Sequence, residues 1–176
     1  MMSLAIVFWM YVILFALIGG MRGWAKEILV SFSVILALAL TALLERYIPF
    51  IRDVLVPQKN SVLFWLRTLI LILLVFFGYQ TVNISRISAK LTREKIEHII
   101  LGTVIGAING YLIAGTIWFY MADSSYPFGN IVSAPSGEIA TIANNMLLYM
   151  APRLLGIPGI YFAVVVAFIF VIVVFI

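Results

Sequence analysis

The stretch LAIVFWMYVILFALIGGMRGWAKE, residues 4–27, decides the fold of this chain. An apolar run from Leu4 to Gly20 leads into a short charged turn, and apolar residues resume directly after Glu27. Two apolar runs separated by a tight turn that contains glycine are typical of an integral membrane protein. The lipid bilayer is therefore the solvent against which the rest of the sequence is interpreted.

The composition supports this interpretation. Hydrophobic residues make up 65% of the chain and charged residues 10%, whereas about 25% of the residues of a soluble domain are charged. The mean hydropathy is +1.19. The net charge of +4 comes from basic residues in short loops between apolar runs, a pattern that fits orientation in a bilayer better than binding to nucleic acid. The chain has no cysteine, which excludes disulfides, cysteine-ligated metals and thiol nucleophiles.

Five apolar stretches are long enough to be membrane spans, since crossing about 30 Å of hydrocarbon takes about 20 residues. These stretches are residues 3–20, 27–45, 61–81, 99–121 and 157–176. We expect the first to be a retained helix and not a cleaved signal peptide, because its positive charges follow the apolar run. The last is a weaker span that reaches the terminal Ile176. The sequence predicts an all-α integral membrane protein, a bundle of about five transmembrane helices in one transmembrane domain over residues 1–176.

The basic residues predict the orientation of these spans. One side carries Arg22, Lys26, Arg86, Lys90, Arg93 and Lys95, and the other carries Arg46, Arg52, Lys59 and Arg153. Loops rich in lysine and arginine stay on the cytoplasmic side. The chain is therefore predicted to have its N-terminus outside and its C-terminus inside.

Two connecting segments are predicted to form amphipathic helices at the membrane surfaces. In residues 84–100, Arg86, Lys90, Arg93 and Lys95 give a basic inner surface that could contact anionic lipid headgroups. A solvated helix held by charge pairs at i,i+4 spacing explains the same pattern. In the second segment, apolar residues recur at helical spacing from Ile139 to Leu154, which predicts an outer interfacial helix or a surface for a partner.

The fourth span carries the strongest packing signal. Gly102, Gly106 and Gly110 fall on one helix face, where missing side chains let another helix approach closely. The contacting helix could belong to the same chain or to a second copy. Asn109 lies beside this face and could form a hydrogen bond across the contact or contribute to a transport path.

Three charged residues near the spans have alternative interpretations. Glu27 lies at the start of the second span, where a helix dipole favours a carboxylate. Arg22 lies between glycines and could bind a phosphate headgroup or a partner carboxylate, or simply anchor the turn on the positive side. Arg67 lies about two turns inside the third span; we expect it to reach the outer edge by snorkelling, with a pathway or partner site as the alternative.

Two motifs, in this order, resemble the colicin V production protein family of bacterial inner-membrane proteins. They are Gly19-x-x-Arg22-Gly23-x-x-x-Glu27 and Gly102-x-x-x-Gly106-x-x-x-Gly110, and the resemblance covers residues 1–155. It implies a role in envelope physiology or toxin production, without a defined reaction. Asn109 stands where family members often carry a basic residue, and the last apolar run is additional.

Enzymatic chemistry has little support in the sequence. His98 is the only histidine, and we find no zinc-binding helix, nucleophile elbow, phosphate-binding loop or paired intramembrane carboxylates. We therefore expect no catalytic, metal or cofactor site. Three functions remain. The first is a non-catalytic envelope factor of the colicin V production type, which acts through helix packing and contacts with lipids or partners. The others are an accessory structural subunit of a larger membrane complex and a small oligomeric channel or transporter. The accessory subunit is suggested by four tryptophans that we predict near the span edges, Trp9, Trp24, Trp65 and Trp118.

Overall fold

The computed structural model describes residues 4–80, 95–129, 132 and 134–175. Every regular element in these residues is a helix, so the predicted all-α class is confirmed. The long helices are α1 (Leu4–Arg22), α2 (Trp24–Tyr47), α4 (Ser61–Tyr79) and α6 (Lys95–Asp123), and the shorter ones are the π-helix η1 (Ile51–Leu55), α3 (Val56–Gln58), α7 (Glu138–Leu148), α8 (Ala151–Leu154) and α9 (Gly159–Phe175).

Four helices, α1, α2, α4 and α6, are long and apolar enough to cross a membrane. They correspond to the first four predicted spans. The fifth predicted span, residues 157–176, forms α9, which has 17 residues and starts only after Pro158. At a rise of 1.5 Å per residue α9 is about 25 Å long, somewhat less than the hydrocarbon thickness of about 30 Å. The structure therefore supports a membrane-embedded helical bundle with four full-length apolar helices among the described residues.

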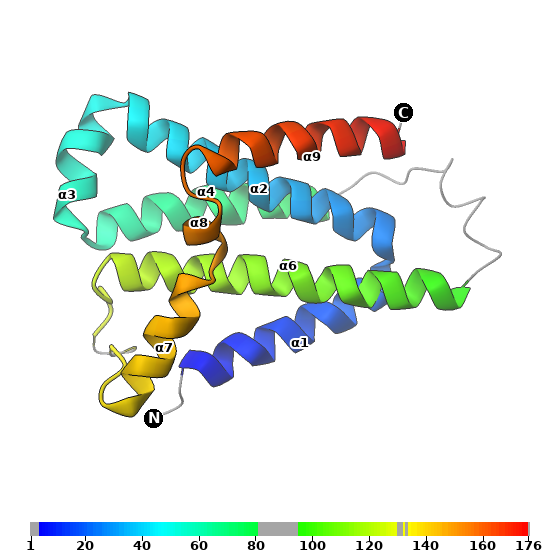
Figure 1. The fold of residues 1–176 in the computed structure, drawn as a ribbon, viewed down its shortest axis with the longest axis horizontal. Coiled ribbons are helices and arrows are strands. Elements are labelled where there is room, and N and C mark those ends of the chain that lie inside the picture. The colour runs from blue at the N-terminus through cyan, green and yellow to red at the C-terminus, as the bar shows by residue number, and fades with distance from the viewer. Residues whose placement is uncertain (1–3, 81–94, 130–131, 133, 176) are drawn as a thin grey trace.

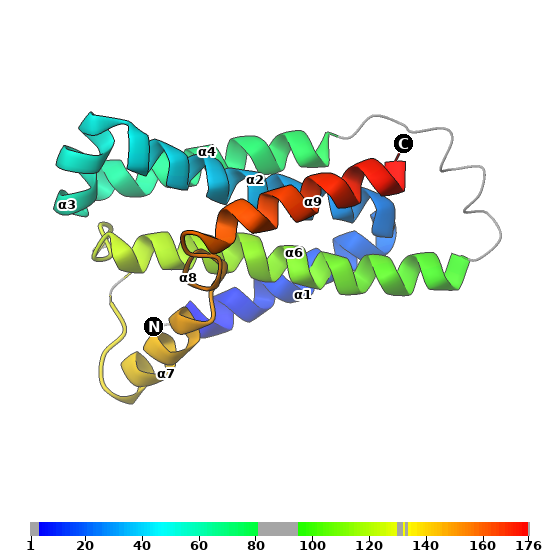
Figure 2. The same ribbon diagram turned by 45° about the horizontal axis from the view of Figure 1, so that its top comes forward.

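The helices lie roughly along one axis (Figure 1). Helices α2 and α4 share a core in which Val30, Val34, Leu71 and Val75 are buried. Helix α6 packs against α2 and also against α1 on its other side, and α9 lies along α2. Figure 2 shows the last of these contacts from another direction. We call the end where α1 and α4 stop and α2 and α6 begin the Arg22 end, and the opposite end the Arg67 end.

The outer surface of the bundle is apolar. Large hydrophobic side chains point away from the core on α1, α4 and α9; Leu17 and Phe77 are each 63% exposed and Val173 is 75% exposed. A continuous apolar surface of this kind is unusual in a soluble monomer and suits contact with lipid.

The predicted amphipathic segments differ from the observed helices. Of the inner segment, residues 84–94 lie outside the described residues, and residues 95–100 form the first turns of α6 and not a separate helix. The outer segment is divided, because α7 ends at Leu148 and Met150 has an extended conformation before α8. Pro152 then occupies the first turn of α8, where its missing N–H is tolerated.

Candidate functional site

The glycines of the two sequence motifs lie against each other. A Cβ atom on Gly19 would contact the carbonyl oxygen of Gly102 and come within 2.7 Å of the Cα atom of Gly106. A Cβ atom on Gly110 would come within 2.9 Å of the Cα atom of Val12. Since real Cβ atoms essentially never approach other atoms so closely, α1 and α6 touch through their backbones. The partner of the glycine face is thus α1 of the same chain.

The turn between α1 and α2 depends on Gly23. Its φ angle of +86° lies in the region that side chains other than glycine's rarely adopt, and its N–H donates to the carbonyl of Gly19 at 2.8 Å. A Cβ atom here would also collide with the imidazole of His98 at the start of α6. Gly23 therefore sets both the sharp turn and the close approach of α6 to it.

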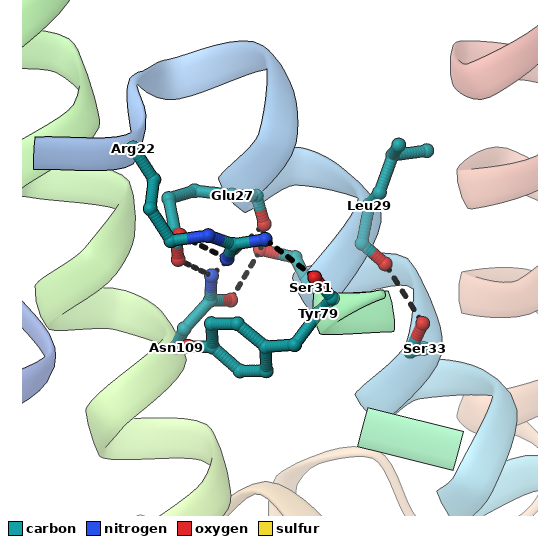
Figure 3. Close-up of polar contacts among 7 residues, drawn as sticks. All are labelled: Arg22, Glu27, Leu29, Ser31, Ser33, Tyr79 and Asn109. Carbon is teal, nitrogen blue, oxygen red and sulfur yellow. Dashed lines mark hydrogen bonds and ion pairs between the residues drawn. The ribbon is translucent and has the colours of Figure 1, made fainter. Parts of the chain in front are cut away.

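Arg22 and Glu27 form a buried ion pair beside this turn (Figure 3). Nη1 of Arg22 lies 2.6 Å from Oε1 of Glu27, and the Glu27 side chain is fully buried. Nη2 of Arg22 donates to the carbonyl of Tyr79 at 3.1 Å, and the guanidinium carbon lies 4.3 Å from the centre of the Tyr79 ring. The carboxylate that Arg22 binds is thus supplied by its own chain, and the second donor, Nη2, also ties α1 to α4.

Asn109 completes the site from α6. Its Nδ2 atom donates to Oε2 of Glu27 at 2.8 Å and to the backbone carbonyl of Glu27 at 2.9 Å. Its Oδ1 atom accepts a hydrogen bond of 2.6 Å from the Ser31 hydroxyl. Asn109 is fully buried, and in Figure 3 it lies between α6 and α2, facing Glu27. The side-chain amide and the carboxylate therefore satisfy each other where no water can reach them.

The charge balance of this site explains how Glu27 can be buried. An isolated carboxylate in an apolar environment is strongly disfavoured unless it is paired and hydrogen-bonded. Glu27 has one cationic partner, one amide donor and a position in the first turn of α2, where the helix dipole adds a favourable field. We call Arg22, Glu27, Ser31, Tyr79 and Asn109 the Arg22 cluster. The cluster joins α1, α2, α4 and α6.

The remaining predicted site residues are not part of this cluster. Arg86, Lys90 and Arg93 lie outside the described residues, and Lys95 is the first residue of α6. Tyr79 and Ser31 were not among the predicted site residues. Ser31 lies one helical turn after Glu27 and so could have been found, whereas nothing near Tyr79 in the sequence indicates its contact with Arg22.

A second charged cluster occupies the Arg67 end. Nε of Arg67 donates to Glu45, and its Nη1 lies 2.6 Å from Oδ2 of Asp123. Lys59 binds the other oxygen of Asp123 at 2.9 Å. The Arg67 side chain is only 8% exposed, so the prediction that it reaches solvent by snorkelling is wrong. Arg67 is neutralised inside the protein by carboxylates from the ends of α2 and α6.

Trp118 lies near the end of α6 and is buried. It is 4% exposed and packs beside Phe8 in a cluster with Met150 and Ala143. Among the described residues there is no group of three or more His, Asp or Glu side chains that could hold a metal ion.

No model of a protein family, no curated protein and no solved structure matches the chain.

Proposed function

We propose that this chain is a non-catalytic bacterial inner-membrane protein of the colicin V production type. In this proposal it acts in envelope physiology or toxin production through contacts that the Arg22 end makes with a partner protein or with anionic lipids. The bundle serves to hold that end in one shape. The helix α9 is proposed as a fifth span, which puts the two termini on opposite sides of the membrane. The larger number of basic residues on the side of Arg22 then favours the N-terminus outside and the C-terminus inside.

The observation that carries this proposal is the meeting of the two motifs. Gly19 lies against Gly102 and Gly106, while Glu27 is bound by Arg22 from the same motif and by Asn109 from the other. Glu27 and Asn109, which are 82 residues apart in the chain, thus share one structural unit. The resemblance to the colicin V production family rests on these motifs and their order, and a shared unit gives a physical reason for their occurrence together.

The shape of the Arg22 end favours a contact function. The charged side chains of the Arg22 cluster are occupied by one another, which leaves no free acid or base among them for chemistry. Met21 is 88% exposed and Lys26 is also exposed at this end. An exposed apolar side chain beside a basic one suits the headgroup region of an anionic membrane or an acidic partner.

A complementation assay tests the proposal. The chain would be expressed in a bacterium that lacks its own colicin V production factor and carries the toxin genes, and released toxin would be measured. We expect the parent and Val104→Leu, which alters an exposed position, to restore release, and Gly106→Leu to fail. An inserted, abundant parent chain that restores nothing would refute the proposal. Purification with a stoichiometric unlike protein would favour the accessory subunit, and a homo-oligomer that conducts ions would favour the channel.

The orientation has its own test because the chain has no cysteine. Met21→Cys at the Arg22 end and Gln58→Cys at the Arg67 end both place a thiol at an exposed position. An impermeant maleimide added to intact spheroplasts is expected to label Gln58→Cys and to spare Met21→Cys. The opposite pattern would reverse the proposed orientation.

A further inference from the structure

A notch at the Arg67 end combines charged and apolar walls. It is a cavity of about 350 Å³ between the last turns of α2, the buried face of α4, the end of α6 and the link from α8 to α9. Glu45, Arg46 and Arg67 line its polar part, and Leu38 and Ile160 belong to its apolar part. The notch shares no residue with the Arg22 cluster.

Arg46 gives the notch an unmatched positive charge. Arg67 and Lys59 are both paired with carboxylates, Arg67 with Glu45 and both with Asp123. Arg46 is exposed and has no carboxylate within ion-pair distance among the described residues; its one ring contact is Tyr47, 5.8 Å away. The charged side chains at this end thus comprise three cations, Arg46, Lys59 and Arg67, and two carboxylates, Glu45 and Asp123. One further anionic group would balance their charge.

An apolar groove continues along the same two helices. A second cavity, of about 340 Å³, lies between α2 and α9. Ile35 is one turn before Leu38 on α2, and Ala163 is three residues after Ile160 on α9, so the groove begins where the notch ends. Ala163 and Ala167 lie one helical turn apart, and their small side chains leave space between the helices. Apart from Ser31, the residues that line the groove are apolar.

We infer that the notch and the groove together bind one anionic phospholipid, with its phosphate at Arg46 and an acyl chain between α2 and α9. The charged part lies near the ends of α2 and α6, at the level expected for headgroups, and the apolar part lies further along α2 and α9, at the level expected for acyl chains. A soluble anion would leave the groove empty, and an uncharged lipid would leave Arg46 without a partner. The arrangement of both parts on two shared helices matches an amphiphile with a negative headgroup.

Native mass spectrometry of the detergent-purified chain tests this inference. Phosphatidylglycerol would be titrated in, with phosphatidylcholine and inorganic phosphate as separate arms. We expect phosphatidylglycerol to be retained and phosphatidylcholine to bind more weakly, with inorganic phosphate unable to displace the lipid. Arg46→Gln should weaken retention about fivefold, since one basic residue near the membrane surface contributes about that much.

Matched controls separate the site from the general lipid layer. Arg52→Gln removes an exposed arginine that is bound to Asp53 and lies outside the notch, and it should bind like the parent. Ala163→Phe and Ala167→Phe each fill the groove and should reduce retention, whereas Val173→Phe, at an exposed position outside it, should not. Circular dichroism would show which variants keep their helices. The test of the groove needs only one of the two alanine variants to be folded.

Three results would overturn the inference. Equal retention in Arg46→Gln and Arg52→Gln would mean that the lipid is bound non-specifically. Equal binding of phosphatidylcholine would remove the role of charge. Displacement of the lipid by inorganic phosphate, with no effect of the groove variants, would assign the notch to a soluble anion.

Discussion

The Arg22–Glu27 ion pair should respond asymmetrically when each charge is removed alone. The Glu27 side chain is fully buried, whereas that of Arg22 is 20% exposed. In Arg22→Gln the carboxylate stays buried with Asn109 as its remaining side-chain donor. Removing one partner of a buried pair costs about 3–5 kcal/mol of unfolding free energy, and the partial exposure of Arg22 puts our expectation at the lower end, about 3 kcal/mol.

The reverse substitution should cost less. Glu27→Gln keeps a side-chain oxygen that can accept from Asn109, and it leaves Arg22 with the Tyr79 carbonyl and access to solvent. We expect a loss of about 1.5–2 kcal/mol, the lower part of the range of about 1.5–3 kcal/mol for a hydrogen bond to a charged group, because Arg22 keeps its other partner. The double variant Arg22→Gln/Glu27→Gln should be more stable than Arg22→Gln alone, because no buried charge remains unpaired.

Denaturant unfolding of the purified chain in detergent, followed by circular dichroism, measures these differences. Arg52→Gln serves as the control, since its pair with Asp53 is exposed and should contribute nothing measurable. Arg22→Lys should fall between the parent and Arg22→Gln, because an ammonium can pair with Glu27 but lacks the second arm that reaches Tyr79. A greater loss for Glu27→Gln than for Arg22→Gln, or strict additivity in the double variant, would refute the reasoning.

Three further outcomes follow from the packing and the second charged cluster. Gly106→Leu should lower folded yield and detergent stability, because any side chain there collides with the backbone of α1, while Val104→Leu at an exposed position should match the parent; equal behaviour of the two would contradict the close contact. Asn109→Ala should lose about 1 kcal/mol in denaturant unfolding, within the range of about 0.6–1.7 kcal/mol seen for polar contacts between membrane helices, and an unchanged midpoint would remove its bridging role. Arg67→Gln should lower the melting temperature more than Arg52→Gln, because it leaves Glu45 without the cation that pairs with it and Asp123 with Lys59 alone; similar melting temperatures would show that the cluster is not needed for stability.

The membrane spans and the packing face of α6 could be predicted because each depends on a local property of the sequence. The composition of an apolar run is enough to show that it can cross the hydrocarbon layer, and glycines four residues apart must share a helix face. The helix that packs against this glycine face could not be predicted from the sequence. Gly19 and Gly106 lie in different spans, and only the folded chain shows that they touch.

Arg67 shows why side-chain environments in membrane spans are harder to predict than the spans. The expectation that it would snorkel considered only its distance from the end of its own helix. Its actual partners, Glu45 and Asp123, are 22 and 56 residues away in sequence, and no local pattern links the three. The division of the outer segment at Met150 has a more local cause, because Pro152 lacks the N–H that a continuous helix would need and lies instead in the first turn of α8.

The arginine that belongs to a sequence motif is not the arginine that is free to bind an anion in the structure. Arg22 belongs to a motif, but both of its terminal nitrogens and its aromatic contact are already used within the chain. An external phosphate could bind it only by displacing Glu27 or Tyr79, which would leave the fully buried Glu27 carboxylate without its cation or α4 without its link. Arg46 belongs to no motif, yet it stands exposed beside a cavity without a carboxylate partner among the described residues. Because binding an anion at Arg46 breaks no existing ion pair, the net gain is larger there, and of these two arginines we expect Arg46, and not Arg22, to bind an anionic ligand.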